Sequence, residues 1–199
     1  MRRLRTLFLL GALAAGPLAL AAPAPSLAQS DANAATAESW PDAAPGDVES
    51  VDSILTALYD VISGPAGQAR DWDRFRSLFI PEARLIPTGR TPEGEHGYQV
   101  WSPGEYAAQA GGFLEQNGFF EREIARSEER FGPVVHACST YDSKRTADDP
   151  EPFARGINSI QLMHDGDRWY VVTIYWAAER PDLPIPGQYL PSRNGGGTP

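Results

Sequence analysis

His136 is the side chain in this sequence best suited to acid–base chemistry. A neutral imidazole can take up or release a proton near pH 7. His136 lies in an apolar, strand-like stretch and shares one face of that strand with Asp142. At about 3.3 Å per residue the two side chains are roughly 20 Å apart, so they cannot form a dyad on one straight strand. The alternative role is a histidine held by a neighbouring hydroxyl or carbonyl group.

Five further residues are candidates for lining a small-molecule pocket, because aromatic walls with few polar groups are the usual make-up of such a site. The three aromatic residues in the first half of the chain have core packing as their alternative role. An amide and a phenol on the last two strands would orient a substrate. The predicted pocket residues are Tyr59, Trp72, Trp101, Asn158 and Tyr175.

The pairing of the last two strands decides which of these side chains share a face. Asp165-Gly166 between them is typical of a two-residue hairpin turn. Such a turn would pair Asn158 with Thr173 and Gly156 with Tyr175, which places Asn158 and Tyr175 on one face. Both faces of the hairpin are mainly apolar. We therefore predict that one face meets the helices and the other meets a second copy of the chain, in a homodimer.

Metal, thiol and nucleotide chemistry have little support in the sequence. The single cysteine, Cys138, excludes an intrachain disulfide and a four-thiolate zinc site. His96 lies near Glu93 and Glu95 in a glycine-rich loop, where a solvated loop is favoured over a metal site. No nucleotide-binding glycine loop, nucleophile elbow or metal-spaced histidine pair occurs. We predict no metal and no cofactor, so an enzyme of this sequence would be a cofactor-free lyase, isomerase or hydrolase with His136 as general base.

Composition indicates a globular chain with one compact domain. Of its 199 residues, 42% are hydrophobic and 22% are charged, which excludes wholesale disorder. The formal net charge is −9, and an acidic chain repels phosphate backbones. Nucleic acid is therefore not an expected partner, and a small molecule is.

Residues 1–28 are predicted to be a secretory signal peptide, because arginines precede an apolar stretch that ends in Ser26-Leu27-Ala28. A membrane anchor is the alternative, but the apolar run contains Pro17 and two glycines and is shorter than the ~20 residues of a spanning helix. Cleavage after Ala28 would give an exported chain, periplasmic or secreted, without membrane contact. We predict a disordered linker over 29–46, a domain over 47–190 and a flexible tail over 191–199.

Helical patterns fill the first half of the domain and strand patterns the second. Helices are predicted from Asp47 to residue 63, from residue 71 to 80 and from residue 102 to 116, the last with a capping box of Ser102 and Glu105. A short strand is expected at 83–86 and a loop at 91–97. Longer strands are expected at 134–141, 153–163 and 169–177. Residues 119–131 suit a helix or a strand, and a hairpin into Val134 favours the strand. The order predicts an α+β fold with three helices on a mainly antiparallel sheet.

The sequence resembles the nuclear-transport-factor-2-like (NTF2-like) superfamily, also called SnoaL-like or cone fold, over roughly 48–178. The resemblance rests on this element order and on the motifs DRFRSLF at 73–79, PEA at 81–83 and DGDRWYVV at 165–172. It implies a curved sheet whose concave face and helices enclose a conical pocket. The family includes dehydratases, isomerases, cyclases and non-catalytic binding proteins, so the fold does not decide the function. The leading hypothesis is an exported protein that binds a small apolar or mixed molecule. The alternatives are the His136 enzyme and a structural role with the cone filled by side chains.

Overall fold

The computed structural model describes residues 40–91 and 94–191. The predicted signal peptide and most of the predicted linker and tail lie outside the described residues. Within them, the helices come first, interrupted by one long and one short strand, and four long strands follow. The elements are α1 Pro45–Val48, α2 Val51–Ile62, α3 Trp72–Ser77, β1 Phe79–Arg90, β2 His96–Tyr98, α4 Pro103–Asn117, β3 Phe120–Phe131, β4 Val134–Lys144, β5 Ala154–His164, β6 Trp169–Ala178 and the 3-10 turn η1 Gly187–Tyr189.

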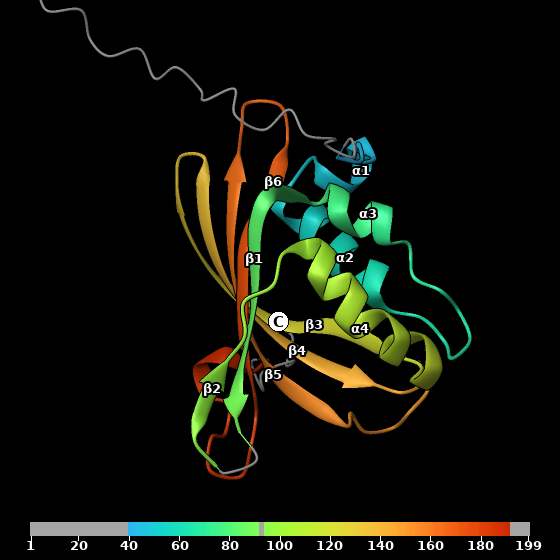
Figure 1. Cartoon of the computed structure of the whole chain (residues 1–199). Coiled ribbons are helices and arrows are strands. Elements are labelled where there is room, and N and C mark those ends of the chain that lie inside the picture. Colours follow the sequence, from blue (N-terminus) through green and yellow to red (C-terminus); the bar gives the residue numbers. More distant parts are fainter. Residues whose placement is uncertain (1–39, 92–93, 192–199) are drawn as a thin grey trace, which may run out of the picture. The chain divides into compact units, whose positions relative to one another are not determined.

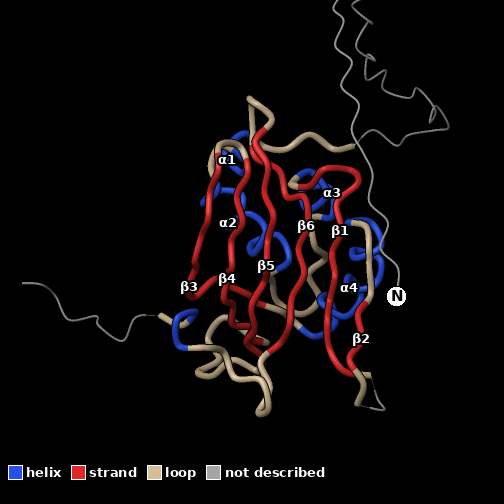
Figure 2. The backbone as a smooth tube through the Cα atoms, turned by 90° about the vertical axis from the view of Figure 1, so that its left-hand side faces the viewer, coloured by secondary structure: helices blue, strands red, loops and turns tan. Residues whose placement is uncertain are grey.

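The strands form one sheet in the order β2-β1-β6-β5-β4-β3. All neighbours pair antiparallel except β1 and β6, which run parallel. The helices cover one face of this sheet, and β3, β4 and β5 bend beneath them (Figure 1). Figure 2 looks onto the opposite, outer face, with the helices behind the strands. The predicted α+β arrangement is therefore present, with a curved sheet under the helices.

Helices α2, α3 and α4 begin at residues whose side chains accept backbone hydrogen bonds. The Ser50 hydroxyl accepts from the backbone of Ser53 at 3.0 Å, so α2 begins at Val51. The prediction of Asp47 as the cap of this helix was wrong, because Asp47 lies in the separate helix α1. The described residues therefore hold four helices where three were predicted. The capping box of Ser102 and Glu105 on α4 is confirmed.

Strand β1 is much longer than the predicted strand at 83–86. It spans Phe79–Arg90 and includes Pro81 and Pro87. A shift in register between Phe79 and Arg84 accommodates the interruption at Pro81 in the pairing with β6. Part of the loop predicted at 91–97 instead contributes the short edge strand β2. Residues 120–131 form strand β3, as favoured.

The β5–β6 hairpin differs in register from the prediction. Its turn has four residues, because the Asp165 carboxylate accepts from the backbone of Asp167 at 2.9 Å and of Arg168 at 3.0 Å. His164 therefore pairs with Trp169, and a bulge further along pairs Asn158 with Trp176. The predicted pairing of Asn158 with Thr173 is wrong by three residues, and an odd shift moves side chains to the opposite face.

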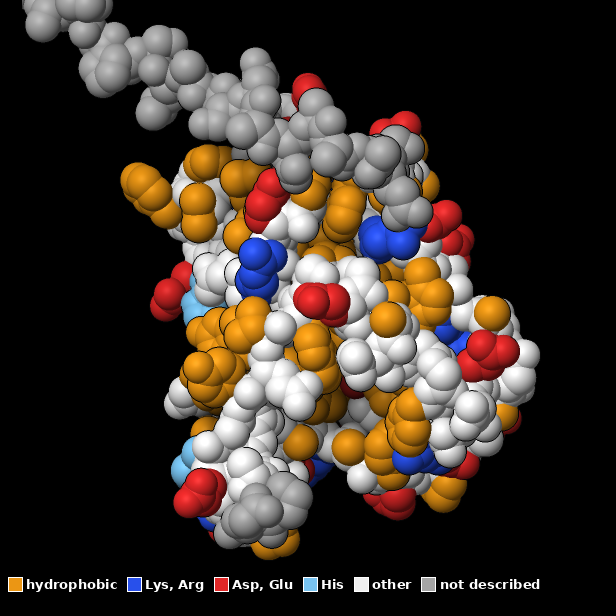
Figure 3. Space-filling view, viewed as in Figure 1, with side chains coloured by type: hydrophobic (Ala, Val, Ile, Leu, Met, Phe, Trp, Pro, Cys, Tyr) orange, Lys and Arg blue, Asp and Glu red, His pale blue; other side chains and the backbone are white. Residues whose placement is uncertain are grey.

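The segment after β6 folds back over the sheet. Turn η1 contacts β3 and β4, and the Thr140 hydroxyl donates to the carbonyl of Tyr189 at 2.6 Å. Thr140 lies on the outer face of β4, so this segment covers part of that face. Acidic and basic side chains are interspersed on the face of the molecule seen in Figure 3, without a large patch of one sign. In the described part of the chain no helix is long and apolar enough to cross a membrane.

Candidate functional site

A cavity of about 220 Å³ lies between the helices and the concave face of the sheet. Helices α2, α3 and α4 contribute to its walls, and β1, β3, β4, β5 and β6 supply the remainder together with the chain segments that precede β3 and β5. Most lining side chains are apolar or aromatic. The remaining ones are polar: Glu121, Ser143 and Asn158. The lining residues are Leu58, Tyr59, Ile62, Phe75, Leu85, Tyr106, Phe119, Glu121, Tyr141, Ser143, Phe153, Ala154, Asn158, Ile174 and Trp176.

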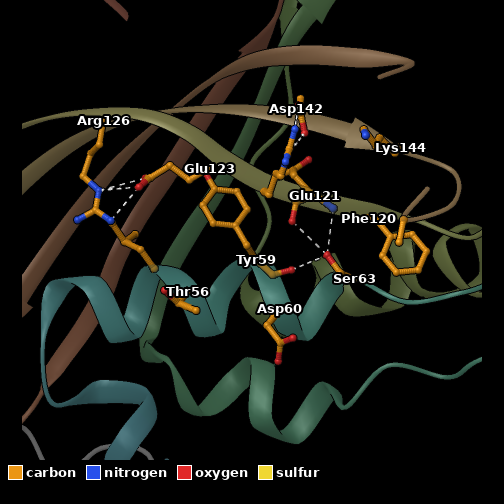
Figure 4. Close-up of a pocket in the computed structure, with 13 residues that line it drawn as sticks. Thr56, Tyr59, Asp60, Ser63, Phe120, Glu121, Glu123, Arg126, Asp142 and Lys144 are labelled. Carbon is orange, nitrogen blue, oxygen red and sulfur yellow. Dashed lines mark hydrogen bonds and ion pairs between the residues drawn. The ribbon is translucent and has the colours of Figure 1, made fainter. Parts of the chain in front are cut away.

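A second, larger hollow lies beside the cavity, between α2 and the edge strand β3. This groove has a volume of about 530 Å³ and carries charged side chains of both signs. Tyr59 and Glu121 line both the groove and the cavity. In Figure 4, which shows the groove, the Tyr59 ring stands between Glu123 and Glu121. Tyr59 and Glu121 therefore separate the mainly apolar cavity from the charged groove.

Glu121 is the unusual group of the cavity. It projects from β3 toward the helices, where the Ser143 hydroxyl donates to its carboxyl group at 2.8 Å. Its backbone N–H donates to the Ser63 hydroxyl at 3.0 Å, which fixes this end of β3 to α2. Burial raises the pKa of Glu121 to about 7, while hydrogen bonding with Ser143 and Asn158 acts in the opposite direction and the Asp142 carboxylate adds to the rise. Both protonation states of Glu121 are therefore populated near neutral pH.

Two tyrosines place hydroxyl groups near Glu121. Tyr106 comes from α4 and Tyr141 from β4, and both line the cavity. Neither hydroxyl makes a hydrogen bond with another described residue, so each can donate to or accept from a molecule in the cavity. Burial and the Glu121 carboxylate raise the pKa of both phenols, so both stay protonated at physiological pH. Tyr141 lies against Gly156, where a β-carbon would collide with the tyrosine hydroxyl.

A chain of hydrogen bonds leads from the cavity to the groove. The Asn158 amide donates to the Tyr59 hydroxyl at 3.1 Å, and Tyr59 and Ser139 are joined at 2.6 Å. Ser139 in turn donates to Glu123, which accepts two hydrogen bonds from Arg126 at 2.9 and 3.1 Å. A carboxylate held by arginine can only accept, so the hydroxyls must point toward Glu123 and the Asn158 NH2 group toward Tyr59. The chain thereby fixes the orientation of the Asn158 amide.

The structure distributes the five predicted pocket residues over several places. Tyr59 and Asn158 line the cavity. Trp72 and Trp101 instead lie beside the ring of Tyr106, each with its ring centroid 6.3 Å from that of Tyr106. Trp72 packs against the hydrophobic core, whereas Trp101 lines a separate hollow at β1 and β2. Tyr175 does not face the cavity: it pairs with Ser159 on the outer face and is 44% exposed. The corrected register of β6 explains this displacement.

His136 also lies outside the cavity. It belongs to the outer face of β4, where its Nε2 atom is 2.9 Å from the Ser159 hydroxyl and 3.8 Å from the Cys138 sulfur. His136 is therefore held by a neighbouring hydroxyl and cannot reach a molecule in the cavity. No cluster of three or more His, Cys, Asp or Glu side chains that could hold a metal occurs among the described residues.

The sequence interpretation missed Glu121, Tyr106 and Tyr141. Glu121 stands in a run of alternating charges that is typical of a solvated strand face. In the structure, β3 turns Glu121 and Glu123 toward the helices, while Arg122 faces outward and pairs with Asp142 at 2.9 Å. The alternation of side chains along a strand was the available signal, because it places Glu121 and Glu123 on one face and Arg122 on the other.

Comparison with known proteins finds distant structural similarity only. No family model matches the sequence, and no curated protein matches it. Similar solved structures include a cystatin-like protein of unknown function from Nostoc punctiforme (10% identity, TM-score 0.49, 67% of this chain and 91% of that one). An uncharacterized cystatin-like protein from Caulobacter vibrioides is similar at 13% identity and TM-score 0.48, over 70% and 93% of the two chains. An NTF2-like protein of unknown function from Shewanella oneidensis has 14% identity and TM-score 0.46, over 63% and 94%.

Proposed function

We propose that this chain binds a small, largely apolar molecule in the cavity between the helices and the concave face of the sheet. The observation that carries the proposal is a cavity of about 220 Å³ with aromatic walls and a few polar groups. An engineered apolar cavity of about 150 Å³ holds benzene in another protein. The cavity here therefore has room for one ring with a short substituent.

Filling the cavity is expected to abolish binding of such compounds. Ala154 lies on the inner face of β5 and lines the cavity, so Ala154→Phe would occupy ligand space without removing a polar group. Ile157 lies on the opposite face of the same strand, which makes Ile157→Phe a matched control. Ligand-detected NMR with a set of single-ring compounds should give binding to the wild-type chain and to Ile157→Phe only. Equal binding to Ala154→Phe would place the ligand elsewhere and contradict the proposal.

A second candidate function is cofactor-free proton transfer in the same cavity. The observation that favours it is Glu121, whose pKa of about 7 suits a group that both takes and gives protons at neutral pH. In this proposal Glu121 takes the role of general base that the sequence interpretation gave to His136. Compounds that bind would be incubated with the protein and followed by mass spectrometry. Turnover that is lost in Glu121→Gln and kept in His136→Ala would support it, and turnover that depends on His136 would exclude it.

We further propose that the mature chain is exported and forms a homodimer through the outer face of the sheet. Tyr98, Tyr175 and Leu183 are 74%, 44% and 45% exposed and line one shallow groove there. Exposed apolar side chains that gather in this way often mark an interface. Mass spectrometry of the gently purified protein tests both points. The denatured mass should correspond to residues 29–199 and the native mass to two subunits; an uncleaved chain or a monomer at tens of micromolar would contradict them.

A further inference from the structure

We infer that the cavity selects a small organic cation, a protonated or quaternary amine on a single-ring frame, over neutral and anionic compounds of the same shape. This inference rests on the proposed binding function and names its ligand class. Three independent features of the lining carry it: the sign of its charge, its aromatic faces and the direction of its hydrogen bonds.

The charge of the lining has one sign. Glu121 is its single acidic residue, and no lysine, arginine or histidine is among the lining residues. Two nearby arginines belong to the groove and have carboxylate partners: Arg122 pairs with Asp142 at 2.9 Å and Arg126 with Glu123 at 2.8 Å. Two more lie behind the lining: Arg70 donates to backbone carbonyls, and the Arg145 guanidinium lies 4.0 Å from the centre of the Phe153 ring. A carboxylate in an apolar chamber without a cation is costly. A ligand that brings the positive charge would remove that cost, and an anionic ligand would add to it.

The walls present aromatic faces. An ammonium group is attracted to the face of an aromatic ring, and cages of such rings recognise quaternary and methylated amines. Rings of this cavity come from α2, α3, α4, β4, β6 and the segments before β3 and β5, so they line the space from several sides. They are Tyr59, Phe75, Tyr106, Phe119, Tyr141, Phe153 and Trp176.

The lining offers hydrogen-bond acceptors to a ligand in the cavity. The Ser143 hydroxyl donates a hydrogen bond to Glu121, and the Tyr59 hydroxyl donates one to Ser139. The NH2 group of Asn158 faces Tyr59, so its Oδ1 atom is left as an acceptor, and no described group donates to that atom. The Tyr106 and Tyr141 hydroxyls can each donate or accept. An ammonium group in this cavity therefore finds acceptors in the Asn158 Oδ1 atom, the two phenol oxygens and the Glu121 carboxylate.

The groups that face Glu121 explain how this preference depends on pH. They are Tyr59 from α2, Tyr106 from α4, and Tyr141 and Asp142 from β4, and the groove side adds Asp60, Arg122 and Lys144. Above pH 7 Glu121 is ionised and attracts a cation, whereas below this value it is protonated and loses the charge. A bound cation stabilises the carboxylate, so affinity for the cation rises as the pH rises through about 7.

Three compounds with the same ring and arm test the inference: benzylamine, benzyl alcohol and benzoate, titrated calorimetrically into the full exported chain. At pH 8 we expect benzylamine to bind at least about tenfold more tightly than benzyl alcohol, and benzoate more weakly than both. At pH 5.5 the advantage of benzylamine should shrink to about twofold or less. Glu121→Gln should remove the advantage at pH 8 and keep the binding of benzyl alcohol.

Glu129→Gln is the matched control, because it removes one negative charge on the exposed part of β3, opposite His136. It should leave the preference for benzylamine unchanged. Benzyl alcohol or benzoate binding as tightly as benzylamine at pH 8 would overturn the inference while the binding cavity stands. An equal effect of both glutamine variants would also overturn it, since the preference would then come from net charge. If none of the three binds, the inference fails, and the Ala154→Phe comparison decides separately whether the cavity binds other compounds.

Discussion

Replacing Arg70 with alanine is expected to lower the free energy of unfolding by at least about 3 kcal/mol. Arg70 is 7% exposed and has no carboxylate partner in the described part of the chain. Its guanidinium instead donates to backbone carbonyls: to Ile62 at 2.9 Å, Gly64 at 2.7 Å and Leu114 at 3.2 Å. These carbonyls end α2 and lie near the end of α4, so one side chain joins the two helices over the cavity. Alanine would leave all three buried carbonyls without this donor.

Urea denaturation measures this loss against a matched arginine. Arg76→Ala removes an exposed ion pair with Asp73 and should cost about 0.5 kcal/mol or less. Arg70→Lys keeps the charge, but an ammonium group lacks the planar fork that spans the carbonyls of two helices, so most of the loss should remain. If Arg70→Ala and Arg76→Ala had equal effects, the clamp between α2 and α4 would not contribute to stability.

The second large effect concerns Glu121 and pH. The folded chain keeps the Glu121 proton up to a pKa of about 7, whereas the unfolded chain releases it near 4.5. The folded state therefore binds more protons between these values, and the free energy of unfolding falls as the pH rises through this window, by at most about 3 kcal/mol. Below pH 4.5 both states are protonated and the stability is fully present. Above pH 7 both are ionised and the cost of the buried charge is complete.

The comparison of wild type with Glu121→Gln isolates this contribution, because all other groups contribute equally to both proteins. Glutamine is neutral throughout, so the variant should become more stable than wild type as the pH rises from 4.5 to 7.5. Paired carboxylates such as Asp47, whose pKa is lowered by Arg74, act in a lower pH range and do not interfere. Urea denaturation at four pH values gives the difference curve. Parallel curves for the two proteins would mean that Glu121 is solvated in the folded state.

Local signals in the sequence were enough to predict most of the elements, but not α1, β2 or the full length of β1, and the long-range pairing was not predictable from them. The capping box at Ser102 and the charged strand at 120–131 follow from residue patterns within a few positions, and both are present. The cavity depends on which face each strand side chain takes. One bulge in β6 and two extra residues in the turn at Asp165 moved Tyr175 to the outer face and brought Asn158 to the inner one. Glu121 was missed because neighbouring charges of both signs are typical of exposed strands, and only the position of α2 reveals its burial.

The close approach of Gly156 to the Tyr141 hydroxyl limits how the lining of this cavity can change during evolution. A side chain at position 156 would occupy the space that the Tyr141 hydroxyl takes. The backbone carbonyl of Ala177 on β6 lies equally close, so a larger residue at 156 would have to displace both the phenol and this strand, and glycine at 156 is what keeps the Tyr141 hydroxyl in the cavity wall. Residue 156 is not itself a lining residue of the cavity. Position 156 can thus influence which molecules the cavity accepts in related chains, although residue 156 does not contact them.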